Sequence, residues 1–194
     1  MRIEDKEGKY SIILDSAVKV FAEFGVENST VSKIAAKAGV ADGTIYLYFK
    51  NKKDILIKFA DDRGEKIFRK FEEAVNSGKD SKEKLFNLIY SHIENFSKNK
   101  DLAVVYQCEL SKIHGCQPKI RELSIRYRQM LKDIFLLGQS EGRVSKNVDL
   151  DFIKDLVSGS INEIINTYIV KENKNIDILE ASGKLVDFIF KGLG

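Results

Sequence analysis

The stretch from Thr30 to Phe49 constrains the fold of this chain more than any other segment. Thr30 suits the position that caps a helix, because its hydroxyl can accept a backbone N–H two or three residues ahead. Gly39 suits the left-handed conformation that ends a helix, since it has no Cβ to clash. The positions between them that recur at helical spacing are apolar: Val31, Ile34, Ala35 and Ala38. We therefore expect a short amphipathic helix that ends at Gly39.

A second short helix is expected after this turn. Ile45 and Phe49 would point into the core. The residues left on the opposite side are Asp42, Gly43, Thr44, Tyr46 and Tyr48. Two short helices joined by a glycine-centred turn are typical of a helix-turn-helix, whose second helix enters the major groove of DNA.

The charge of this segment favours the same interpretation. Five lysines lie between Thr30 and Lys53 against a single acid, Asp42, whereas the whole chain carries a net charge of only +3. A basic patch on a nearly neutral body fits a surface that contacts DNA phosphates. The alternative is that Lys50, Lys52 and Lys53 merely solvate a turn.

The segment resembles the N-terminal signature of the tetracycline-repressor (TetR) family of transcriptional regulators. The resemblance covers roughly residues 10–60 and rests on Thr30, Ile34-Ala35, Ala38-Gly39-Val40, Gly43 through Phe49, Lys52 and Leu56. Helical periodicity along the chain predicts an all-α fold of about nine helices. The expected organisation is a three-helix helix-turn-helix DNA-binding head at residues 1–50 and a larger helical ligand-binding and dimerisation domain at residues 51–194.

The family pattern implies roles for individual residues of the head. It assigns Thr30, Tyr48 and Lys52 to phosphates. Candidates for base edges or groove walls are Lys33, Asp42, Thr44 and Tyr46, and Ser32 occupies a position that reads bases in some relatives. Gly43 is expected to permit close approach of its backbone. Two heads on one duplex would require a palindromic double-stranded operator.

Helical periodicity predicts further helices in the rest of the chain. A first helix from about Lys9 to Phe24 is ended by Gly25, and a fourth helix that starts near Asn51 connects head and body. The last two predicted helices carry more apolar residues than one stripe needs, Ile161 and Phe188 among them. Such a surplus indicates a partner surface, and we expect a homodimer formed by these two helices. The alternative is that both stripes belong to an ordinary core.

Composition excludes several classes of protein. No run approaches the roughly 18 apolar residues of a membrane span, and the N-terminus lacks the apolar stretch of a signal peptide, so we expect a cytoplasmic protein. Cys108, Cys116, His92 and His114 show no metal-ligand spacing, and we expect no metal or cofactor. The chain has no nucleophile–base pair or phosphate loop and is not expected to be an enzyme.

A finer resemblance suggests an effector. Val40 through Leu56 is similar to the head of bacterial fatty-acid-degradation repressors that respond to long-chain acyl-coenzyme A, and Leu102 through Leu110 and Gly159 through Glu163 are similar to their bodies. These relatives usually carry an arginine where this chain has Ser111. The residues expected to bind the effector are Tyr106, Gln107, Glu109, Lys112, Arg126 and Tyr168, with Arg121 and Arg128 as further cations for the phosphates.

A second effector class stays open at this point. The same architecture could sense drugs or aromatic compounds and control efflux genes. That version would use acids and aromatic rings in its cavity, which Glu109, Glu163, Tyr106 and Tyr168 could supply.

Overall fold

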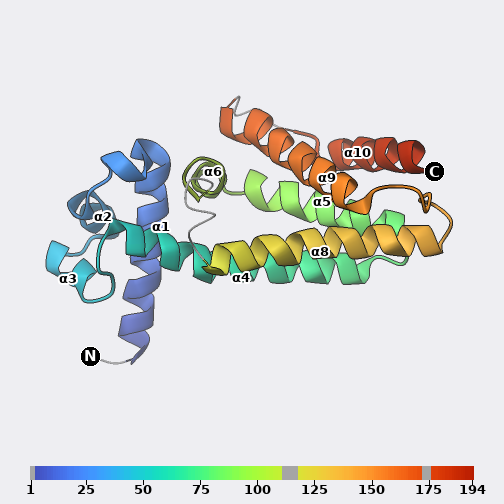
Figure 1. Ribbon diagram of the computed structural model, residues 1–194. Helices are drawn as coiled ribbons and strands as arrows, with labels where there is room; N and C mark the ends of the chain where they lie inside the picture. The colour runs from blue at the N-terminus through green and yellow to red at the C-terminus, as the bar shows by residue number, and fades with distance from the viewer. Residues whose placement is uncertain (1–2, 111–117, 172–175) are drawn as a thin grey trace. The chain divides into compact units, whose positions relative to one another are not determined.

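The computed structural model describes residues 3–110, 118–171 and 176–194, and every regular element among them is helical (Figure 1). The α-helices are α1 (Ile3–Asn28), α2 (Val31–Ala38), α3 (Asp42–Tyr46), α4 (Lys52–Ser77), α5 (Ser81–Ser97), α6 (Lys100–Val104), α8 (Pro118–Ser140), α9 (Leu150–Ile164) and α10 (Ile178–Leu193). Two π-helical segments, η1 (Val105–Leu110) and η3 (Ile165–Lys171), continue α6 and α9. The expected all-α fold is confirmed for the described residues.

The chain packs as two compact units. Unit 1 comprises Met1–Gly64 and Asp101–Ile120, and unit 2 comprises Glu65–Lys100 and Arg121–Gly194. Helix α4 therefore begins in unit 1 and ends in unit 2. These packing units cut the chain elsewhere than the predicted functional division between residues 50 and 51, which stays a prediction.

The core of unit 1 joins α1, α2, α3, the first half of α4 and η1. Its members are apolar and buried, and they include Ile13, Leu14, Phe21, Ile34, Ala35, Ile45, Phe49, Ile55, Phe59, Val105 and Leu110. Helix α1 starts earlier than predicted, but the break at Gly25 is confirmed, because this residue has φ 71° and ψ 160°. Such dihedral angles carry little steric penalty only for glycine.

Unit 2 is built around α5, which contacts α9, η3 and α10. Helices α5 and α8 run antiparallel, since Ser81 lies beside Gly138 and His92 lies beside Tyr127 (Figure 1). The prediction that Ile161 lies at a dimer interface is wrong: Ile161 has no exposed surface and belongs to the core of unit 2. Among the described residues, no helix has the length and apolar character that crossing a membrane requires.

A polar pair lies buried between α5 and α8. Nδ1 of His92 and the hydroxyl of Tyr127 are hydrogen-bonded at 2.8 Å, and Phe71 and Phe96 pack against the imidazole. Burial lowers the pKa of His92 from 6.5 to about 3, because the apolar surroundings disfavour the charged form. The imidazole is therefore neutral in the folded protein at physiological pH.

This burial predicts an acid-sensitive fold. Between pH 6.5 and 3 the unfolded chain binds a proton at His92 that the folded chain does not, so the free energy of unfolding should fall by up to about 1.4 kcal/mol per pH unit as the pH is lowered. Urea unfolding at a series of pH values measures this slope. His92→Phe should remove the contribution, whereas Tyr127→Phe should retain it because the imidazole stays buried. Equal slopes in the wild type and His92→Phe would contradict the assignment.

Candidate functional site

Helices α2 and α3 form the predicted helix-turn-helix in unit 1. The Thr30 hydroxyl accepts the backbone N–H of Lys33 at 3.2 Å, which confirms it as the cap of α2. Gly39 has φ 68° and ends α2, and the N–H of Val40 donates to the Ala35 carbonyl at 3.0 Å. The turn therefore has the geometry that the residue types predicted.

Helix α3 separates an inward from an outward side. Ile45 and Phe49 are buried, as predicted, whereas Tyr46 and Leu47 expose 60% and 71% of their surface. A Cβ placed on Gly43 would meet nothing within 4 Å, so a large partner can approach this backbone closely. Leu47 was not among the predicted site residues, although its position next to Tyr46 on the outward side could have indicated it.

Two predicted base contacts bind each other. The Ser32 hydroxyl donates to the Asp42 carboxylate and so ties α2 to the first turn of α3. A carboxylate in the first turn is also favoured by the helix dipole. Thr44, the third residue of α3, is half-buried. In this conformation Ser32 and Asp42 add a polar contact between the two helices.

Two predicted DNA-contacting lysines donate to carbonyls at the end of α1 and just after it. Lys33 Nζ lies 3.9 Å from the centroid of the Phe24 ring and donates to the Asn28 carbonyl at 3.4 Å. Lys52 Nζ donates to the carbonyls of Glu27 at 2.6 Å and Ser29 at 3.2 Å. An ammonium carries three N–H groups, so these two bonds leave Lys52 a third one for a phosphate.

Tyr48 is integrated into the head. Its ring is 6.4 Å from that of Tyr10 and 6.3 Å from that of Phe49, and its carbonyl accepts from Lys58 at 2.9 Å. The Tyr48 hydroxyl is buried, and no residue in the described part of the chain forms a hydrogen bond with it. The phosphate contact expected of Tyr48 stays a prediction.

Three of the predicted effector residues lie on η1 in unit 1. Glu109 is 8% exposed, and its carboxylate accepts the backbone N–H of Val26 at 3.2 Å. The Tyr106 ring meets that of Phe59 edge-on at 6.3 Å, and burial raises the pKa of its hydroxyl. Gln107 is half-buried. Lys112 lies outside the described residues.

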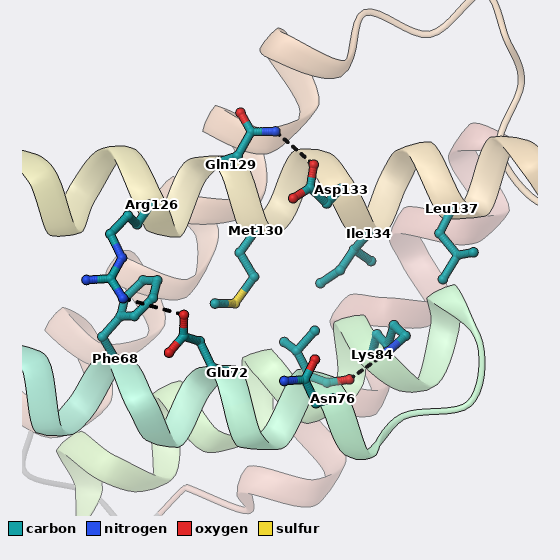
Figure 2. A pocket seen from close by; sticks show the side chains of 11 residues that line it. Phe68, Glu72, Asn76, Lys84, Arg126, Gln129, Met130, Asp133, Ile134 and Leu137 are labelled. Atoms are coloured by element: carbon teal, nitrogen blue, oxygen red, sulfur yellow. Dashed lines mark hydrogen bonds and ion pairs between the residues drawn. The ribbon is translucent and has the colours of Figure 1, made fainter.

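Arg126 lies in unit 2 on the rim of a groove of about 460 Å³ between α4 and α8 (Figure 2). Its guanidinium is 4.0 Å from the centroid of the Phe68 ring and pairs with Glu65 at 3.1 Å, Glu72 at 3.4 Å and Glu122 at 3.8 Å. The apolar part of the lining consists of Phe68, Val75, Met130, Ile134 and Leu137. Three carboxylates therefore compensate the charge of Arg126.

The other predicted effector residues of unit 2 are not among the residues that line this groove. Tyr168 lies on η3 and is 40% exposed, and Arg128 pairs with Asp155 at 3.8 Å. In the described residues no group of three His, Cys, Asp or Glu side chains is arranged to hold a metal ion.

Comparison with known proteins connects both the N-terminal and the C-terminal part of the chain to one family. The model of bacterial regulatory proteins of the tetR family matches residues 13–58, and that of the C-terminal region of YsiA-like protein matches residues 60–192. The fatty acid metabolism regulator protein of Bacillus subtilis is 35% identical over 192 residues, which cover 98% of both chains.

Two solved structures are similar over nearly the whole chain. The fatty acid degradation regulator FadR of Bacillus halodurans has a TM-score of 0.84 and 32% identity, covering 95% of this chain and 96% of that one. FadR of Bacillus subtilis, in complex with stearoyl-CoA, has a TM-score of 0.83 and 34% identity, covering 95% and 100%. With a helix-turn-helix in unit 1 and a match to a family model over each part, the chain belongs to the TetR family of bacterial regulatory proteins.

Proposed function

We propose that this chain is a transcriptional repressor of fatty-acid metabolism genes that long-chain acyl-CoA releases from DNA. The observation that carries the proposal is the full-length likeness to a fatty acid metabolism regulator at 35% identity. The stearoyl-CoA complex of a FadR with 34% identity supports the effector class. A repressor of this kind would act in the cytoplasm, where its DNA lies.

DNA binding is assigned to the outward side of α3 and its surroundings. Tyr46 and Leu47 are exposed and would contact base edges, with Leu47 suited to a thymine methyl group. Gly43 would let the backbone approach the groove. Phosphate contacts are assigned to Thr30, Tyr48 and Lys52, and Lys33, Thr44, Ser32 and Asp42 would line the groove walls.

A homodimer is part of the proposal, because one short helix reads few bases. Exposed apolar side chains remain on the last two helices, with Phe152 64% exposed and Leu156 49% exposed on α9, and Phe188 74% exposed on α10. Burying them in a second copy would place two heads on one duplex, and half-sites about 34–36 Å apart would form a palindrome.

To release DNA, acyl-CoA must bind the conformation with low DNA affinity more tightly than the conformation that binds DNA. We assign its recognition to the residues implied by the family, Tyr106, Gln107, Lys112, Arg126 and Tyr168, with Glu109 considered below. Arg121 is exposed at the start of α8 and is a further cation for the phosphates.

The proposal is tested by selecting a DNA duplex with the protein and then measuring whether stearoyl-CoA releases it. Purified protein should select a palindromic duplex from a random library, and stearoyl-CoA should raise the dissociation constant of that duplex at least tenfold, whereas coenzyme A and stearate alone should not. Fluorescence anisotropy measures both. Selection of no palindrome would overturn the DNA-binding assignment. Release by cationic aromatic drugs but not by stearoyl-CoA would instead favour an efflux regulator.

Tyr46→Ala should lower the preference for the selected duplex over random duplex by tenfold to hundredfold, since a base contact contributes about 1–3 kcal/mol of discrimination. Thermal unfolding should be unchanged, because the side chain is mostly exposed. Ile12→Ala shortens another exposed apolar side chain of unit 1 and serves as the control. Retained preference would remove Tyr46 from the readout surface.

Phe152→Asp and Phe188→Asp, one on each of the last two helices, should each yield monomers in sedimentation velocity. A buried carboxylate at a pair interface costs several kcal/mol, on the order of 3–5 when it is unpaired. Ile125→Asp places the same charge on α8, where Ile125 is 58% exposed, and should remain dimeric. Dimers in both helix variants would locate the interface elsewhere.

A further inference from the structure

Two side chains distant in sequence hold the loop that precedes the recognition motif. We give the name loop to Val26–Thr30, which comprises the last residues of α1 after its break at Gly25 and the connection to the cap of α2. Lys52, at the start of α4, donates to two of its carbonyls, those of Glu27 and Ser29. Glu109, on η1, accepts its first N–H, that of Val26. All of these residues belong to unit 1.

The break at Gly25 and the bond to Glu109 belong together. Gly25 leaves the helical dihedral angles, and the N–H that follows it is satisfied by the Glu109 carboxylate. A Cβ on Gly25 would lie 3.6 Å from Glu109 Oε1, so the carboxylate sits directly against this backbone. Glu109 is buried, and loss of its acceptor would leave the Val26 N–H without this partner.

The segment that carries Glu109 is also where effector residues were predicted. Val105 and Leu110 anchor η1 in the core of unit 1, with 0% and 3% of their surface exposed. Tyr106 and Gln107 lie between them. π-Helical turns form i→i+5 hydrogen bonds, are rare and occur frequently at functional sites. One short segment therefore combines the predicted effector residues with a direct bond to the loop before α2.

We propose that Glu109 is a positioning residue that couples the effector to DNA binding through the backbone of Val26. The proposal rests on the function proposed above. When the effector binds and η1 moves, the hydrogen bond between Glu109 and the Val26 N–H changes. The loop transmits this change to Thr30 and the start of α2. Lys52 keeps the other end of the loop on α4, so the displacement is taken up by the orientation of α2 and α3.

Three variants separate this role from packing. Glu109→Met keeps the length of the side chain but has no oxygen acceptor, Glu109→Gln keeps the acceptor without the charge, and Glu23→Ala removes an exposed carboxylate of α1 as a control. The dissociation constant of the selected duplex is measured with and without stearoyl-CoA. Calorimetry measures stearoyl-CoA affinity, and thermal unfolding measures the fold.

In Glu109→Met the ratio of the two duplex dissociation constants should fall to within threefold of one, while stearoyl-CoA affinity stays within threefold of the wild type. Glu109→Gln and Glu23→Ala should keep the wild-type ratio. A wild-type ratio in a folded Glu109→Met would overturn the proposal. Loss of stearoyl-CoA affinity would do so as well, because Glu109 would then be an effector ligand.

A second measurement does not depend on the effector. Amide hydrogen exchange at Val26, followed by NMR, should accelerate at least tenfold in Glu109→Met and stay near the wild-type rate in Glu109→Gln. If the wild type binds its duplex but ignores stearoyl-CoA, the proposed effector fails. The exchange rate, together with the affinity of Glu109→Met for the duplex, then decides whether Glu109 positions the loop. Unchanged exchange and unchanged duplex affinity would overturn that role.

Discussion

The outward side of α3, to which we assign DNA binding, depends on the burial of α2 and α3 against α1. Phe21, Ile34 and Ile45 have no exposed surface, and Phe49 is nearly buried. Helix α3 has only five residues, too few to be stable alone, so its conformation depends on this burial. Each of these side chains contributes roughly 1.5–3 kcal/mol when buried. Tyr46 and Leu47 point outward because their neighbours Ile45 and Phe49 are buried in the core.

Features that depend on near neighbours were predictable from the sequence. The cap at Thr30, the helix break at Gly25, the helix end at Gly39 and the inward direction of Ile45 follow from residue type and spacing over a few positions. Contacts between residues far apart in the sequence could not be predicted from residue type and local spacing. The bond from Glu109 to Val26 spans 83 positions, and no local signal marks a glutamate as the partner of a backbone N–H.

Helical periodicity also left open which neighbour an apolar residue meets. On α9, Ile161 is buried within unit 2 whereas Phe152 is exposed, although both are large and apolar. An apolar stripe on a helix predicts that its side chains are buried. It does not show whether the same chain or a second copy covers them. The π-helical segments add to this ambiguity, because an extra residue per turn rotates every later position relative to an α-helical expectation.

The sequence shows which residues are charged, but it did not predict which groups they contact. Arg126 was expected to face phosphates, yet Glu65, Glu72 and Glu122 surround it. Each of these pairs is partly open to solvent, and exposed ion pairs contribute only about 0–1 kcal/mol each. The contact with Phe68 keeps the guanidinium in place, and a phosphate at Arg126 would have to displace one carboxylate and approach the other two. A phosphate contact at Arg126 would therefore require its ion pairs to open, and this contact stays a prediction.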